Sequence, residues 1–119
     1  MGNVKAYLWE VNIGSIKRVQ DELQVWSAHN FPGRGEDEPL LGIVEEVGEL
    51  CHAILKRKQG IRGSYEQHSA AIEDALADIL IFACDYANSQ GIDLEATLER
   101  VWDTEVKPRD WRPDTLDKG

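Results

Sequence analysis

The segment 71–87, AIEDALADILIFACDYA, constrains the fold more than any other part of the chain. Its apolar residues recur at the three- and four-residue intervals of a helix and cover almost the whole circumference. A helix that is apolar on nearly every side has to be buried against several neighbours. The segment therefore predicts a helical core. No stretch of the sequence shows the alternation of apolar and polar residues that is typical of a β-strand.

The rest of the chain provides further helices, separated by glycine and proline. Phe31-Pro32-Gly33, the loop around Gly60 and Gly63, and Pro108 mark the breaks. The expected helices cover residues 15–30 with Ser15 as N-cap, about 40–58, about 69–89 and about 94–106. Residues 1–119 are thus expected to form one all-α, four-helix domain, with its core at about 15–111 and irregular ends.

Composition limits the partners of such a domain. The net charge is −9, from 22 acidic against 13 basic residues, which disfavours a nucleic acid polymer as partner. No apolar stretch reaches the length of a membrane span. Cys51 and Cys84 lack zinc-site spacing and are expected to be reduced thiols. We expect a soluble, cytoplasmic protein that does not bind membranes.

Acidic residues lie beside the predicted core on two of the helices. Glu45, Glu46 and Glu49 occur together in GIVEEVGEL, on the flank of an apolar stripe. Asp78 lies in the middle of the apolar segment 71–87, and Asp74 shares its helical face. An ionised aspartate is rarely buried unless it is paired or bound to a metal.

Few basic residues are available to pair with these acids. Between Lys58 and Arg100 the only basic residue is Arg62. Two acid clusters without counter-charge indicate a bound cation, and oxygen ligands favour Mg²⁺, with Mn²⁺ as a substitute, over zinc. The alternative is a solvated helix face, which as a protein-interaction module would bind a basic partner. The residues alone leave both interpretations open.

EEVGEL on one helix and ALADILIFACDYANSQGIDLE on the next resemble the MazG-like nucleoside triphosphate pyrophosphohydrolases of the all-α NTP pyrophosphatase superfamily. The family pattern is EExxE followed by ExxD, and the resemblance covers about residues 19–111. It implies a four-helix MazG-like bundle assembled with a partner subunit, as a homodimer or homotetramer. It also implies Mg²⁺-dependent hydrolysis of a nucleoside triphosphate, in particular a deoxynucleoside triphosphate, to monophosphate and pyrophosphate, for nucleotide-pool housecleaning or control.

The resemblance assigns roles to the acids with one departure from the family pattern. Ala75 stands where the family usually has the Glu of ExxD, and Asp74 is expected to supply the missing oxygen. The departure leaves open a catalytically weakened nucleotide-binding protein. The expected catalytic residues are Glu45, Glu46, Glu49 and Asp78, and the expected metal ligands are Glu46, Glu49, Asp74 and Asp78.

The substrate contacts are expected from aromatic, amide and basic side chains. WSAHNF has the composition of a base pocket, although Trp26 also continues the apolar stripe of the first helix and suits core packing equally well. Phe82 has the same alternative, and Lys56 could instead complement a helix dipole. The expected contacts are Trp26, His29, Asn30, Lys56, Phe82, Asp85, Lys107 and Arg109.

Overall fold

The computed structural model describes residues 14–113. They form four α-helices, one short π-helical segment and no β-strand, which confirms the all-α prediction for this part of the chain. The elements are α2 (Ser15–Asn30), α3 (Glu38–Gln59), α4 (Tyr65–Ser89), α5 (Leu94–Val101) and η1 (Trp102–Val106). The irregular ends expected from the sequence lie largely outside the described residues.

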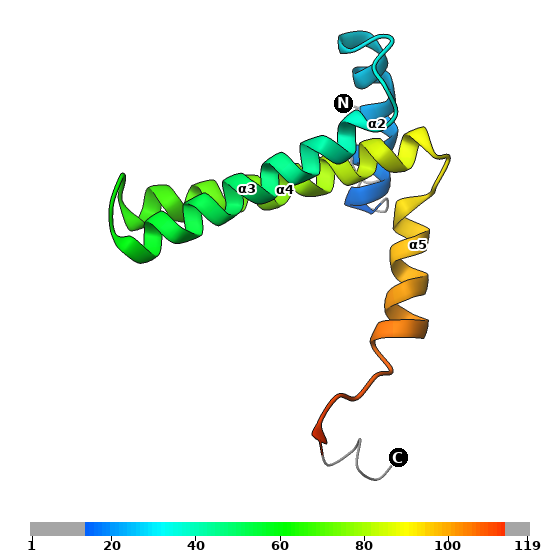
Figure 1. Ribbon diagram of the computed structural model, residues 1–119. Coiled ribbons are helices and arrows are strands. Elements are labelled where there is room, and N and C mark those ends of the chain that lie inside the picture. The colour runs from blue at the N-terminus through cyan, green and yellow to red at the C-terminus, as the bar shows by residue number, and fades with distance from the viewer. Residues whose placement is uncertain (1–13, 114–119) are drawn as a thin grey trace, which may run out of the picture.

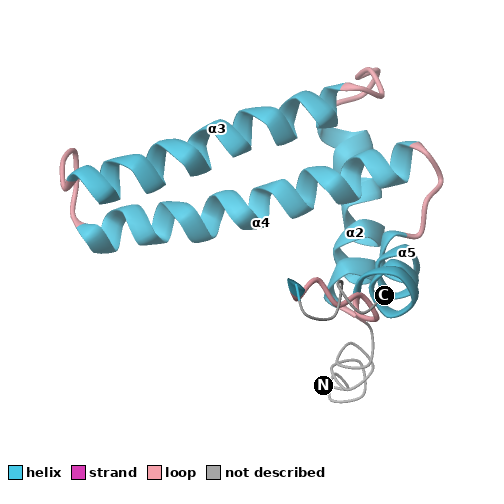
Figure 2. Cartoon of the chain, turned by 60° about the horizontal axis from the view of Figure 1, so that its bottom comes forward, coloured by secondary structure: helices cyan, strands magenta, loops and turns pink. Residues whose placement is uncertain are grey.

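A long antiparallel hairpin of α3 and α4 dominates the structure (Figure 1). α2 crosses the open end of this hairpin and packs against α4, and α5 packs against α2. Figure 2 shows the hairpin with α2 and α5 gathered at one end and the connecting turn at the other. Within one chain α2 therefore covers the α3–α4 hairpin only at its open end.

The ends of α2 and α3 follow ordinary helix-terminus chemistry. The N-cap of α2 is Gly14, so the expectation of Ser15 was wrong by one residue, because Ser15 already has helical geometry. α3 begins at Glu38, about two residues earlier than expected, with Pro39 in the first turn, where its missing N–H is tolerated. Gly60 ends α3 with φ of 70°, a left-handed conformation that costs glycine little.

α4 begins four residues earlier than the expected Ser69 because of a capping box. The backbone N–H of Gln67 donates to the Ser64 hydroxyl at 3.1 Å, and the Ser64 backbone N–H donates to the Gln67 side chain at 2.8 Å. Both orphan donors at the helix start are thereby satisfied. The reciprocal pair lengthens α4 by about one turn at the tip of the hairpin.

The last expected helix, 94–106, is divided in the structure. α5 is α-helical only to Val101, and the chain continues as the π-helical η1, in which the Lys107 N–H donates to the Trp102 carbonyl at 2.8 Å. At the other end of α5, the Asp93 side chain accepts from the Ala96 N–H at 3.1 Å, as expected for an N-cap.

Small residues form the interface between α3 and α4. Gly42 and Ala53 of α3 and Ala75 of α4 are buried. A Cβ atom added at Gly42 would lie 2.5 Å from the Phe82 ring, so this ring packs directly on the α3 backbone. The small side chains allow the two helices to approach closely over most of their length.

Large apolar side chains of α4, from the segment 71–87, remain exposed in this single chain. Leu76 and Leu80, one turn apart, are 51% and 55% exposed. The reason is geometric, because among the described helices α3 and α2 are those that pack closely against α4, and they leave part of its surface uncovered. None of the described helices is long and apolar enough to cross a membrane.

A buried glutamine connects α2 to the turn between α4 and α5. The Gln20 amide donates to the Ile92 carbonyl at 2.5 Å and accepts from the Leu94 N–H at 3.2 Å. Asn88 of α4 donates to the Gln20 backbone carbonyl at 2.9 Å. The orientation of α2 across the hairpin is thus set by hydrogen bonds as well as by apolar packing.

Two glycines of α3 should respond oppositely to alanine. Gly42→Ala places a methyl group against Phe82 and should destabilise the fold by about 1–3 kcal/mol. Gly48→Ala meets nothing within 4 Å and should stabilise by about 0.5–1 kcal/mol through helix propensity. Urea denaturation of both variants at one protein concentration measures the two effects. Equal and same-signed changes would contradict the close contact at Gly42.

Candidate active site

A cavity of about 550 Å³ lies where α2 crosses the hairpin. Its lining combines aromatic rings, a guanidinium group and carboxylates, a mixture suited to a ligand with both an apolar face and charge. α4 contributes Asp78, Phe82 and Asp85, and α3 contributes Glu45. The lining residues are Leu23, Trp26, Phe31, Arg34, Glu38, Leu41, Gly42, Glu45, Asp78, Ile81, Phe82 and Asp85.

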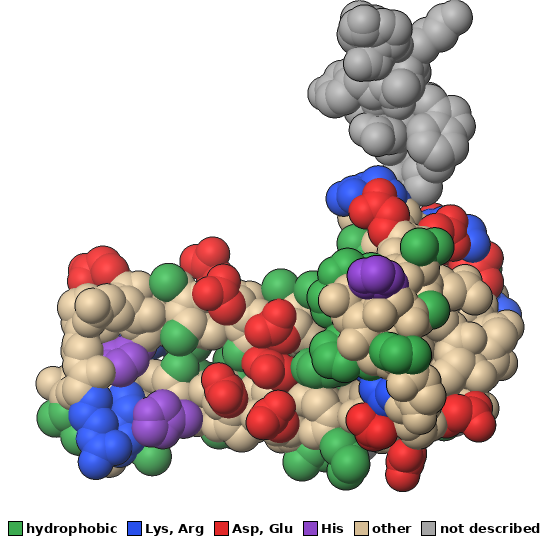
Figure 3. Space-filling view, turned by 90° about the horizontal axis from the view of Figure 1, so that it is seen from above, with side chains coloured by type: hydrophobic (Ala, Val, Ile, Leu, Met, Phe, Trp, Pro, Cys, Tyr) green, Lys and Arg blue, Asp and Glu red, His purple; other side chains and the backbone are tan. Residues whose placement is uncertain are grey.

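The acids predicted from the sequence gather over the middle of the hairpin. Figure 3 shows acidic side chains along this stretch and basic side chains at the hairpin tip. Glu46 and Asp78 are half-buried, whereas Glu45, Glu49 and Asp74 are exposed. Within residues 14–113, none of these five carboxylates forms an ion pair with Lys, Arg or His.

Burial and neighbouring negative charge together shift the pKa of Glu46. Partial burial, followed by the negative charges of Asp78, Glu49 and Glu45 and a hydrogen bond with Asp78, raises the pKa of Glu46 above its ordinary value of 4.5. Glu46 of α3 is thus close enough to Asp78 of α4 for the two carboxyl groups to interact. The structure therefore joins the two acid clusters through Glu46 and Asp78.

A second cavity continues along the hairpin from the first. Glu45 lines both, and Glu49 lines the second together with His52 and His68. The second cavity has a volume of about 490 Å³. Carboxylates of α3 thus lie between an aromatic chamber at the open end of the hairpin and a polar groove toward its tip.

A buried ion pair closes the aromatic chamber on the side away from the acids. Arg34, in the loop before α3, donates from Nη2 to Asp85 Oδ2 at 2.6 Å and to the Ser27 hydroxyl at 2.7 Å. The guanidinium carbon lies 5.6 Å from the centroid of the Phe31 ring. Arg34 therefore connects α2, the loop and α4 at the candidate site.

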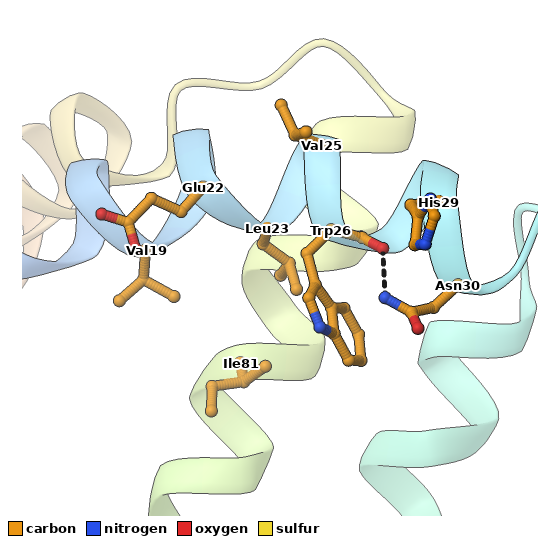
Figure 4. Close-up of a pocket in the computed structure, with 8 residues that line it drawn as sticks. All are labelled: Val19, Glu22, Leu23, Val25, Trp26, His29, Asn30 and Ile81. Carbon is orange, nitrogen blue, oxygen red and sulfur yellow. Dashed lines mark hydrogen bonds between the residues drawn. The ribbon is translucent and has the colours of Figure 1, made fainter.

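Trp26 separates the chamber from a neighbouring groove on α2. Figure 4 shows its indole pointing from α2 toward α4. Trp26 lines both the chamber and a groove of about 680 Å³, which is also lined by His29 and Asn30. The Asn30 side chain donates to the Trp26 carbonyl at 2.8 Å. His29 and Asn30 thus line only the outer groove, whereas Trp26 lines both cavities.

The predicted basic contacts lie away from the chamber in this chain. Lys56 is at the hairpin tip, where it donates to Gln59 at 3.0 Å. Lys107 pairs with Asp103 at 3.5 Å, and the Arg109 guanidinium lies over Trp111 at 6.0 Å, both beyond α5. None of the three lines either of the two cavities that Glu45 borders.

The donor set fits a hard divalent cation in chemistry, although the side chains are not arranged as a complete site. Carboxylate oxygens are ligands that Mg²⁺ accepts, and Glu46 is near Asp78. In the part of the chain that the structure describes, no three metal-binding side chains converge on one point. Ala75 is buried between the helices at 4% exposure, and the neighbouring Asp74 is exposed.

A family comparison agrees with this geometry. The model of the MazG nucleotide pyrophosphohydrolase domain matches residues 34–107, more than half of the 119 residues. The chain belongs to this family. A search of curated proteins and a search of solved structures found no match. Family membership implies nucleotide pyrophosphohydrolase activity in general and confirms the resemblance noted in the sequence.

The match places the acids and Arg34 inside the MazG domain and leaves α2 before it. Sequence reasoning identified Glu45, Trp26, Asp78, Phe82 and Asp85, all of which line the chamber. It missed Arg34, because an arginine in the polar loop GRGEDEP has no periodicity that would place it. The signal available was Asp85, a carboxylate on an apolar helix that needed a cation.

The raised pKa of Glu46 predicts that replacing it with glutamine stabilises the fold in a pH-dependent manner. Because the native-state pKa lies above the ordinary 4.5, the native protein loses stability as pH rises from that value through the raised pKa. In EDTA, the Glu46→Gln variant should therefore be more stable than the original protein at neutral pH. Below pH 4.5, the ordinary pKa of Glu, the variant should have no such advantage. Urea denaturation across this pH range tests it, with Glu73→Gln on the exposed side of α4 as control. A Glu46→Gln protein less stable at neutral pH would contradict the electrostatic assignment.

Proposed function

We propose that this MazG domain hydrolyses a nucleoside triphosphate, in particular a deoxynucleoside triphosphate, to the monophosphate and pyrophosphate in a Mg²⁺-dependent reaction. Mn²⁺ is the expected substitute, and the role is nucleotide-pool housecleaning or control. The observation that carries the proposal is the chamber in which Trp26, Phe31 and Phe82 face the same space as Glu45 and Asp78. Aromatic rings suit a base, and clustered carboxylates suit a metal-bound phosphate.

The length of the chamber supports a nucleotide lying along α4. Asp78 and Asp85 are seven residues apart, which is about two helical turns or 10 Å. Aromatic side chains and Arg34 surround Asp85, and the other acids surround Asp78. A nucleotide would therefore lie with its base near Asp85 and its phosphates near Asp78.

The acids would divide the chemical work between them. Glu46, Glu49 and Asp78, with Asp74 nearby, would hold Mg²⁺, which when bound neutralises phosphate charge and activates water. Glu45 lines both cavities and is exposed, so its carboxylate is available to orient a water and accept its proton. Attack of that water on the α-phosphorus breaks the bond to the β-phosphate oxygen and releases pyrophosphate.

Pyrophosphate release from the canonical dNTPs and NTPs tests the proposal. The reaction is measured with Mg²⁺, with Mn²⁺ and with EDTA, and we expect release only with a divalent metal. Asp78→Asn and Glu49→Gln should each lower kcat/KM by about 100-fold or more, since both remove a charged oxygen needed near the phosphates. Glu73→Gln, on the same helix as Asp78 and outside both cavities, should retain activity. Metal-independent release, or equal loss in all three variants, would contradict this site.

Nucleotide binding without hydrolysis is the second candidate function. It is favoured by Ala75, which is buried where the family usually has Glu, and by the absence of three converging metal ligands in the described residues. Binding of a nucleoside triphosphate by a folded protein that releases no pyrophosphate would support it. In that case Ala75→Glu should introduce turnover, whereas a protein that is already active should gain little.

We further propose that the domain works as a homodimer or homotetramer assembled over the exposed side of the hairpin. Leu41 and Val44 of α3 are 65% and 69% exposed, and Leu76 and Leu80 of α4 are similarly open. Burying these side chains would provide about 25 cal/mol for each Å² of apolar surface removed from water. Light scattering should give a mass of at least twice 13.4 kDa. A monomer at micromolar concentration would contradict this assembly.

A further inference from the structure

Basic side chains that form no ion pair are concentrated at the tip of the α3–α4 hairpin. They are Lys56, Arg57, Lys58 and Arg62. Within residues 14–113, the ion-paired cations all lie elsewhere: Lys17, Arg18, Arg34, Arg100, Lys107 and Arg112. Figure 3 shows histidine side chains beside the basic side chains of the tip, between them and the acids. The surface of the hairpin therefore changes from negative to positive toward its tip.

The second cavity lies where this change of charge occurs. Glu45, Glu49 and His52 of α3 line it in this order toward the tip, and His68 contributes from α4. Glu45 and His52 are seven residues apart, which is about two helical turns or 10 Å, and they project from α3 within about 20° of each other. Glu45 also lines the aromatic chamber. A ligand that extends from the chamber past Glu45 therefore approaches His52.

His68 already uses the one N–H donor of its neutral form. Its Nε2 lies 2.9 Å from the carbonyl oxygen of Ile61, which can only accept, so Nε2 carries the proton and donates. The residue is 8% exposed, and a Cβ atom added at Gly63 would lie 3.2 Å from its Cε1 atom. His68 therefore supports the loop at the hairpin tip and is not the donor available to a ligand.

His52 has a free N–H donor. Its side chain is exposed, and neither ring nitrogen forms a hydrogen bond or an ion pair with another described residue. Glu49, three residues earlier on the same helix, is a neighbour on the helix surface but makes no such contact with it. An imidazole offers at least one N–H donor in either protonation state. Among the side chains that line the second cavity, His52 therefore has the donor that an anionic ligand could use.

We propose that the second cavity receives the terminal phosphates of the nucleotide, with His52 donating a hydrogen bond to the pyrophosphate group. This inference rests on the proposed function for the identity of the ligand as a nucleoside triphosphate, and it extends that function to the β- and γ-phosphates. With the base near Asp85 and the α-phosphate near Asp78, the remaining phosphates continue past Glu45 into the second cavity. The basic side chains of the tip add a positive potential that favours a polyanion there.

The lining of the second cavity favours phosphates over a base. No Phe, Tyr or Trp is among its lining residues, whereas the rings suited to a base line the chamber. Glu45 and Glu49 would repel a phosphate that entered alone. The terminal phosphates are therefore expected to enter together with the divalent cation that the acids would hold. Pyrophosphate binding should accordingly require that cation.

Binding of inorganic pyrophosphate tests the inference without hydrolysis. Dissociation constants are measured by calorimetry with Mg²⁺ for pyrophosphate, for the dNMPs and for the α,β-methylene analogues of the dNTPs. His52→Leu removes the donor. His52→Asn and His52→Gln are the matched controls, because they place an amide N–H near the Nδ1 and Nε2 positions of the ring, respectively. Thermal denaturation establishes that each variant is folded.

We expect His52→Leu to weaken binding of pyrophosphate and of the triphosphate analogues by about 10- to 100-fold, because a hydrogen bond to a charged group is lost. Binding of the dNMPs should not change, since they lack the terminal phosphates. At least one of the two amide variants should restore most of the affinity. Unchanged affinities in His52→Leu, an equal loss for the dNMPs, or no pyrophosphate binding by the original protein would each overturn the inference.

The proposed function fails separately, through an absence of pyrophosphate release from any natural nucleotide. Pyrophosphate binding that depends on His52, in a protein without turnover, would uphold the inference while overturning hydrolysis. Turnover with a KM that is the same in His52→Leu as in the original protein would do the reverse.

Discussion

Close packing of α3 against α4 determines the geometry of everything else at the candidate site. Gly42, Ala53 and Ala75 remove side-chain bulk from the interface, and the Phe82 ring occupies the space above Gly42. Because the helices approach closely, a carboxyl group of α3 meets one of α4, and Glu46 interacts with Asp78. A bulkier interface would separate the two acid clusters and leave each as an ordinary solvated helix face.

Because the acids lie close together, they repel one another in the protein without bound metal. Burial, followed by the like charges of Asp78, Glu49 and Glu45, holds the pKa of Glu46 above its ordinary value, and no described basic side chain pairs with these acids. Clustered, unpaired carboxylates are common at functional sites, because the arrangement that disfavours the empty protein favours a cation. A cation held by these acids would also allow a MazG domain with a net charge of −9 to accept a polyanionic nucleotide.

At the opposite end of the chamber, the charge of the acid is compensated by a basic side chain of the same chain. Arg34 compensates Asp85, and Ser27 connects both to α2. Gln20 connects α2 to the turn after α4. The helix that carries Trp26 is therefore held by hydrogen bonds at two points, Gln20 and Ser27. The chamber thus has one end whose charges are paired and preorganised and another whose acids lack a counter-charge. Such an asymmetric site is suited to a ligand with a neutral base and a charged phosphate chain.

Much of this could be predicted from the amino-acid sequence alone. Helical periodicity predicted the all-α fold and the positions of the four helices to within a few residues, because the period of apolar residues directly reflects helix geometry. EExxE and Asp78 identified the acids and the family, since these residues are local signals. Helix starts were less accurate, because the reciprocal Ser64–Gln67 contacts decided where α4 begins.

Only the tertiary structure decided which distant residues meet. Arg34 and Asp85 are separated by 51 positions and pair because α2 and the following loop cross the open end of the hairpin. The same crossing directs Trp26 into the chamber while leaving His29 and Asn30 in the outer groove. Sequence determined the helices and their charges, because those depend on neighbours along the chain. The pairing of a loop arginine with a helix aspartate depends on packing, for which local sequence carries no periodic signal.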